Sequence, residues 1–172
     1  MDDLTVALSI NLDEAFPLLV EDVSTRLFWG LRRLTGDAHH AEDLTQETLI
    51  RAYRALQAYE PERIRSLRVQ PWLWTIALNL GRNHLRDRSR GPTLVEATSE
   101  PIAFDADPPD LAAWQDRLSR LPKTQREAVV LRHVVGMDIS EIAVATGRLE
   151  GTCKADIHRG LHRLRQIMEA EK

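Results

Sequence analysis

Cysteine, aromatic residues and long apolar runs are all scarce in this chain of 172 residues. The single cysteine, Cys153, excludes an intrachain disulfide, as is usual in a reducing compartment. No apolar run approaches the roughly 20 residues of a membrane-spanning helix, and the N-terminus lacks the basic region of a secretory signal. Aromatic residues make up 5% of the chain and β-branched alternation is absent. We therefore predict an all-α, cytoplasmic protein that does not insert into a membrane.

Sequence motifs for catalysis or metal binding are also missing. No nucleotide-binding loop, zinc-ligand spacing or nucleophile motif occurs. His39 and His40 are adjacent, so they point to different sides of a helix and make a poor metal pair. Cys153 has no resolving thiol and is interpreted as a small buried hydrophobe. We expect no enzymatic activity, no cofactor and no metal site.

One stretch without lysine or arginine interrupts an otherwise helix-patterned sequence. Residues 91–110 contain four prolines and five acidic residues. Proline removes a backbone donor and restricts the preceding residue, and such a composition buries too little apolar surface to offset its ordering entropy. We predict a flexible acidic linker at 91–110 between two small helical domains, at 12–90 and 111–170.

Charge is distributed in blocks along the chain. The net charge is −3, but residues 26–95 carry +5 and residues 117–172 carry +4, whereas residues 1–25 and 96–116 carry −6 each. Two basic modules flanked by acidic segments fit a polyanionic partner. Ordinary solvated helix faces produce the same pattern, so charge alone leaves both interpretations open.

The first domain begins with an apolar stripe at three- and four-residue steps up to Leu34. We predict a helix capped by Asp13, with Pro17 in its first turn and Gly36 as its C-terminal cap. A second helix starts at Asp37 and carries a mostly polar row opposite its apolar face. Such a row suits docking of a protein, although a solvated face with one stray apolar residue is common. The row consists of Asp43, Gln46, Glu47, Ile50 and Arg54.

Residues 60–70 are predicted to form a basic loop, and Pro71 to open a helix with a basic C-terminal half. Single-stranded DNA would suit this region, because bases stack on aromatic rings while cations meet phosphates. The alternatives are that the arginines interact favourably with the negative end of the helix dipole and that Trp72 and Trp74 are core residues. The candidate DNA contacts are Arg63, Arg65, Arg68, Trp72, Asn79, Arg82, Asn83 and Arg86.

The second domain contains the pattern of a helix-turn-helix. Asp138 and Glu141 have capping-box spacing, Gly147 follows a short helix, and a longer basic helix starts near Glu150. An ordinary helical hairpin is the alternative. Recognition helices place their N-terminal residues at base edges in the major groove. The candidate contacts are Thr152, Lys154, Ala155, His158, Arg159 and Arg163.

These blocks together resemble group IV sigma factors of bacterial RNA polymerase, the extracytoplasmic function (ECF) type. RLTGDAHHAEDLTQETLIRAYRALQAY and WLWTIALNLGRNHLRDR look like the family's region 2, and LPKTQREAVVLRHVVGMDISEIAVATGRLEGTCKADIHRGLHRLR looks like its region 4. The resemblance implies that the polar row docks on the clamp coiled coil of the β′ subunit. It implies that residues 60–88 open and read the −10 element around an extruded base, and that the helix from Glu150 reads the −35 element.

The resemblance also implies partners: core RNA polymerase through the β′ clamp and the β flap, promoter DNA, and an anti-sigma factor. Because the chain ends at Lys172, soon after the recognition helix, no sensor domain is expected and control is expected from outside. The alternative is a stand-alone helix-turn-helix regulator whose N-terminal half dimerises or binds a ligand.

Four positions depart from the family pattern. Thr75 and Leu78 stand where many members have basic or polar residues, and Leu149 replaces a usual proline or serine. Asp156 stands where an arginine is usual. A carboxylate there either repels phosphates or accepts a hydrogen bond from a cytosine amine.

The length of the linker sets how the modules reach DNA. The family's promoter elements lie some 17 base pairs apart, about 58 Å. The linker spans roughly 65–70 Å when fully extended but averages near 25 Å as a free coil. We therefore expect the free modules to collapse toward each other, and the isolated protein to bind promoters weakly without polymerase.

Overall fold

The computed structural model describes residues 2–87 and 110–171, and the side chains of Asp2 and of residues 83–87 lie outside that description. Every regular element in these residues is a helix, which confirms the all-α class. The predicted linker, apart from Asp110, lies outside the described residues. No helix of the described part is long and apolar enough to cross a membrane.

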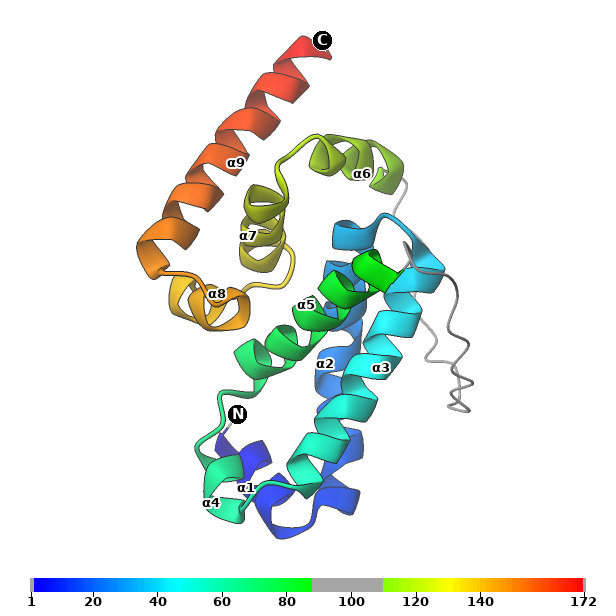
Figure 1. The fold of residues 1–172 in the computed structure, drawn as a ribbon, viewed down its shortest axis with the longest axis vertical. Helices are drawn as coiled ribbons and strands as arrows, with labels where there is room; N and C mark the ends of the chain where they lie inside the picture. Colours follow the sequence, from blue (N-terminus) through cyan, green and yellow to red (C-terminus); the bar gives the residue numbers. More distant parts are fainter. Residues whose placement is uncertain (1, 88–109, 172) are drawn as a thin grey trace.

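The N-terminal module is a helical bundle in which α2, α3 and α5 pack together and α1 and α4 cover one end (Figure 1). Its core consists of leucines and alanines from the facing stripes of these helices, such as Leu27, Leu44 and Ala77. Its helices are α1 (Asp2–Ile10), α2 (Leu12–Thr35), α3 (Ala38–Gln57), α4 (Pro61–Arg65) and α5 (Val69–Asp87).

The start of α2 differs from the prediction. Asn11, not Asp13, is the N-cap, and its side chain accepts a hydrogen bond from the backbone N–H of Glu14. Pro17 therefore lies inside the helix rather than in its first turn. Because Asp13 is not needed as a cap, its carboxylate is free to accept a hydrogen bond from the Tyr53 hydroxyl of α3. At the other end, Gly36 adopts φ 79° as the predicted C-terminal cap.

Two helices were missed by the sequence patterns. α1 lies outside the predicted domain, yet it buries Leu8 against the end of the bundle. Residues 60–70, predicted as a loop, contain α4, which buries Ile64, and α5 already begins at Val69 rather than at Pro71. Pro71 still falls in the first turn of α5, where a backbone N–H has no partner within the helix, so it costs little.

The C-terminal module contains the predicted helix-turn-helix, formed by α8 and α9. Asp138 caps α8 through both hydrogen bonds of a capping box with Glu141. Gly147 ends α8 with φ 67°, a left-handed conformation that favours glycine. The helix predicted to start near Glu150 does start there. The helices are α6 (Leu111–Ser119), α7 (Lys123–His133), α8 (Ile139–Thr146) and α9 (Glu150–Ala170).

The two modules pack directly on each other and share one buried cluster. α8 lies along α5, while α6 and α7 contact α2 (Figure 1). At the centre, Trp74 fits over Gly30 and beside Val135: a Cβ at Gly30 would lie 2.5 Å from the Trp74 ring and 2.8 Å from a Val135 methyl. The missing side chain of Gly30 therefore makes room for this contact, and the modules form a closed arrangement.

Candidate polymerase-binding and nucleic-acid-binding surfaces

The predicted polymerase-binding row lies together on the outer face of α3. Asp37 fixes the start of this helix by accepting a hydrogen bond from the His40 backbone N–H, which is the main reason its pKa is lowered. Asp43 and Arg54 are exposed, and Gln46, Glu47 and Ile50 are half-buried. The structure thus brings all five residues of the predicted row to one surface.

Two residues outside the predicted row hold its side chains and its helix in place. Arg51 donates a 2.6 Å hydrogen bond to Glu47. Tyr53 packs edge-on against Phe16 and donates its hydroxyl proton to Asp13, and this hydrogen bond is the main reason that the pKa of Tyr53 is raised. Neither Arg51 nor Tyr53 was predicted, although the four-residue spacing of Glu47 and Arg51 is the usual one for a helical ion pair.

The arginines of the α4 region, predicted to contact −10 DNA, do not form one cluster. The Arg63 guanidinium lies 3.6 Å from the centre of the Tyr59 ring. Arg65 donates to the Ser9 hydroxyl of α1 at 2.9 Å.

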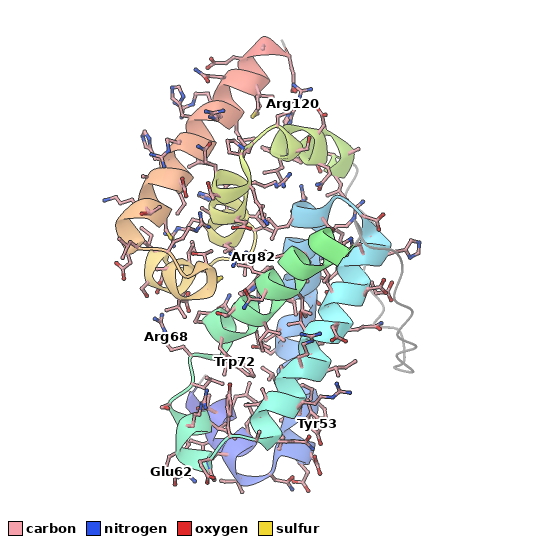
Figure 2. All side chains as sticks on the ribbon, viewed as in Figure 1. Tyr53, Glu62, Arg68, Trp72, Arg82 and Arg120 are labelled. Atoms are coloured by element: carbon pink, nitrogen blue, oxygen red, sulfur yellow. The ribbon has the colours of Figure 1, made fainter. Side chains whose placement is uncertain are left out.

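Arg68 points across the module boundary to the start of α8. Its guanidinium donates to the Ser140 hydroxyl at 3.1 Å and lies 3.9 Å from the Asp138 carboxylate and 3.8 Å from that of Glu141. Figure 2 labels Arg68 where the chain enters α5. In this closed arrangement Arg68, one of the arginines predicted to contact −10 DNA, therefore pairs with carboxylates of the other module.

The two tryptophans of α5 have different environments. Trp72 is half-buried and packs near Tyr59, with ring centres 6.1 Å apart. Trp74 is 2% exposed and belongs to the shared core. The core alternative is thus the correct one for Trp74, and stacking with a base is excluded for it in this arrangement.

Four −10 candidates remain on α5, and the structure describes the side chains of two of them. Asn79 and Arg82 are exposed, with Arg82 donating to the Asn79 side chain at 3.4 Å. Asn83 and Arg86 belong to α5, but their side chains lie outside the described residues. Thr75 donates to the Pro71 carbonyl and Leu78 is buried in the core, so neither departure presents a free group to a phosphate.

The predicted −35 residues lie on the exposed half of α9. Thr152, Lys154, His158, Arg159 and Arg163 are exposed, and Ala155 is half-buried. The buried side of the helix is formed by Cys153, Asp156, Gly160 and Leu164.

Asp156 corrects the sequence-based expectation for this helix. Its carboxylate does not face solvent but accepts 2.8 Å hydrogen bonds from Arg148 and Arg159. The repulsion and cytosine interpretations both assumed a surface carboxylate, and the structure places it inside the module. Arg148, which binds it, was not among the predicted residues.

The described ranges 2–87 and 110–171 contain no cluster of three His, Cys, Asp or Glu residues that could hold a metal ion. The geometry of the described residues thus consists of one polar face on α3, a cationic and aromatic surface around α4–α5, and an exposed basic face on α9.

Comparison with known proteins identifies the family of the chain. The description "Sigma-70 region 2" matches residues 19–91 and "Sigma-70, region 4" matches residues 111–164. The ECF RNA polymerase sigma factor SigE of Mycolicibacterium smegmatis is 35% identical over 159 residues, covering 87% of this chain and 60% of SigE. RNA polymerase sigma factor CarQ of Myxococcus xanthus is 34% identical over 162 residues, covering 90% of each protein.

A solved structure is similar over nearly the whole fold. It contains the sigma factor RpoE in complex with the anti-sigma factor NepR from Bartonella quintana, with a TM-score of 0.72 and 25% identity over 91% of this chain and 98% of that one. The matched regions define a protein built from sigma-70 regions 2 and 4. The chain belongs to the ECF group of RNA polymerase sigma factors, which are transcription initiation factors and not enzymes.

Proposed function

We propose that the chain directs core RNA polymerase to promoters by reading two DNA elements, with α9 at the −35 element and the α4–α5 surface at the −10 element. The observation that carries the proposal is the pairing in one chain of a helix-turn-helix with an exposed basic α9 and a region-2 bundle with the α3 row. A stand-alone regulator needs no region-2 fold, so the match to residues 19–91 argues against that alternative.

The α3 row is the surface proposed to dock on the clamp coiled coil of the β′ subunit. It combines exposed charge at Asp43 and Arg54 with the half-buried Ile50, so that a polar rim surrounds one apolar contact. Because the row lies away from α8, docking on it is compatible with either a closed or an open arrangement of the modules.

The surface around Trp72 is the proposed −10 site. The Tyr59 and Trp72 rings lie near each other at an angle of 55°, and the Arg63 guanidinium lies over Tyr59, so the surface offers an aromatic and cationic environment for an unstacked base. Binding an extruded base recovers the few kcal/mol of unstacking it, so opening needs no ATP. Asn79 and Arg82 extend the same side of α5 as proposed contacts for the single strand.

Reading both elements requires the modules to separate. Arg68 of the −10 surface lies 3.1 Å from Ser140 of the helix-turn-helix, whereas the two promoter elements are about 58 Å apart. The closed arrangement cannot span that distance. The free protein is therefore expected to bind promoter DNA weakly, and polymerase is expected to hold the modules apart.

Run-off transcription with purified core polymerase tests the proposal. We expect promoter-specific transcripts only when this chain is added, and in gel shifts we expect tight DNA binding only when core enzyme is present. Asp43→Lys should reduce capture of core polymerase, whereas Glu21→Lys, the same change at an exposed position of α2, should not. Transcripts that do not depend on the chain would refute the function, and tight specific binding by the chain alone would refute the requirement for opening.

Two further assignments follow from the proposed role. The chain would act in the cytoplasm, where core polymerase and promoters are found, and it would be controlled by an anti-sigma factor, as the complex of the similar RpoE suggests. We expect that partner to cover the α3 row and α9. Co-purification from the host should recover it, and recovery of core polymerase alone under uninduced conditions would contradict the assignment.

A further inference from the structure

The recognition helix α9 starts without a side-chain cap. Leu149 occupies the N-cap position, provides no side-chain oxygen and is 80% exposed. Gly147 makes the turn but has no side chain with which to hold it. The orientation of α9 must therefore be fixed by other contacts.

Arg148, in the turn, adds polar contacts to the packing of the buried side of α9. One guanidinium nitrogen donates to Asp156 of α9 at 2.8 Å and to the Thr124 carbonyl at the start of α7 at 3.2 Å. The other donates to the Glu127 carboxylate of α7 at 3.3 Å. The side chains of Glu127 and Asp156 are 7% and 6% exposed, so these charge-assisted hydrogen bonds are shielded from water.

Asp156 connects this buried arginine to an exposed one. While its Oδ2 accepts from Arg148, its Oδ1 accepts from Arg159 at 2.8 Å. The Arg159 side chain is 56% exposed and stands on the surface that faces outward from α9. A guanidinium has five N–H donors, so one bond to Asp156 leaves the others free for DNA.

We propose that Asp156 is a positioning residue for −35 recognition, which holds Arg159 in the orientation that contacts DNA and is itself anchored by Arg148. This inference rests on the proposed role of α9 in reading the −35 element. Restricting the Arg159 side chain before binding lowers the entropy lost when it contacts DNA. The carboxylates of Glu127 and Asp156 pair with the guanidinium groups of Arg148 and Arg159. Asp156 therefore presents no unpaired negative charge to the phosphates.

The test is Asp156→Asn in full-length holoenzyme, measured on a pool of promoter duplexes that is randomised over the −35 positions and selected with the wild-type holoenzyme. Arg148 and Arg159 donate to different oxygens of Asp156, and an amide replaces one of these acceptors with an NH2 group, which is a donor. We expect DNA binding about tenfold weaker, as for the loss of a charge-assisted hydrogen bond. Glu169→Gln, the same loss of charge at an exposed position near the far end of α9, should leave binding unchanged.

A double-mutant cycle with Arg159→Ala separates positioning from simple destabilisation. If Asp156 acts through Arg159, Asp156→Asn should cause no further loss of binding in the Arg159→Ala background. An equal loss in both backgrounds would mean that Asp156 only supports the fold, and would overturn the inference.

Other outcomes distinguish the competing explanations. Tighter binding by Asp156→Asn would show repulsion of phosphates, and a changed preference at one base pair without any effect of Arg159→Ala would show direct base reading. Either result overturns the inference but leaves the function of α9 intact. If the wild-type holoenzyme selects no sequence over the −35 positions, the proposed role of α9 fails and the inference falls with it.

Discussion

Two arginines of this molecule each lie between two carboxylates, in opposite environments. Arg68 reaches from one module to the other, lies 3.8–3.9 Å from its carboxylates and has a side chain that is 52% exposed. Arg148 stays within one module, lies 2.8–3.3 Å from its carboxylates and is 17% exposed. Exposed ion pairs contribute little and are screened by salt, whereas removing one partner of a buried pair is costly. The Arg68 ion pairs between the modules are thus easily broken, and the Arg148 ion pairs within the helix-turn-helix module are not.

The largest expected effect comes from removing the buried arginine. Arg148→Met leaves Glu127 without its ion-pair partner and Asp156 with Arg159 alone, so we expect a loss of about 3 kcal/mol in the stability of the C-terminal module. Urea unfolding measures this loss. Arg163→Met, the same substitution at an exposed position of α9, should change stability by less than about 0.5 kcal/mol. Similar losses of stability for Arg148→Met and Arg163→Met would show that the buried ion pairs of Arg148 contribute no more than an exposed side chain.

The next effect concerns the apolar contact that keeps the modules closed. Val135→Asp introduces a charge beside Trp74, where the valine is 3% exposed, and its desolvation favours separation of the modules by about 2 kcal/mol. We expect the single unfolding transition of a shared core to split in two, and small-angle scattering to show a larger particle. Val134→Asp is the control, because its side chain is 40% exposed. One unchanged transition in Val135→Asp would argue against the shared core.

A smaller effect is expected for the exposed cluster itself. Arg68→Ala should weaken the closed arrangement by at most about 1 kcal/mol, and the difference from wild type should vanish in high salt. Amide exchange at the first turn of α8, measured with and without salt, reports it. Arg63→Ala removes a neighbouring charge that contacts Tyr59 and not α8, and should leave this exchange unchanged. An effect as large as that of Val135→Asp would mean that Arg68 dominates the closure.

The smallest effect depends on pH. A hydrogen bond from the Glu141 backbone N–H, followed by one from the Ser140 hydroxyl, lowers the pKa of Asp138 from 3.8. A lowered carboxyl pKa adds stability above the unfolded value, and this is lost as the pH falls through the folded-state pKa. Below about pH 3.8 the first turn of α8 should therefore lose exchange protection. Asp138→Asn should remove this local dependence, and a midpoint above 3.8 for Asp138 by NMR would contradict the sign.

Features set by local chemistry were the predictable ones. The capping box at Asp138, the left-handed Gly36 and Gly147, and the stripe of α3 each depend on neighbours within a few residues. The start of α2 was misplaced by two residues because two cap-forming side chains, Asn11 and Asp13, lie close together in sequence.

Features set by distant contacts were not predictable. α5 is buried on two sides because α8 packs against it and Trp74 lies in the core shared by the two modules, and no single-helix pattern contains that second partner. From the sequence, Asp156 is predicted to be a surface carboxylate. In the structure the turn brings Arg148 beside it, and Arg148 also binds Glu127 of α7. For the candidate sites, sequence therefore predicted the surface rows but not the contacts that orient them.

Cys153 lies at 0% exposure beneath the turn of the helix-turn-helix, with its sulfur 3.8 Å from the Thr146 hydroxyl. It is the only thiol in the chain. A maleimide can reach it only when the packing around that turn opens, so the labelling rate measures how often α8 and α9 come apart. The unmodified protein thus carries a chemical reporter of its own local unfolding, and comparing labelling rates for free protein, holoenzyme and promoter complex would show where this domain is most rigid.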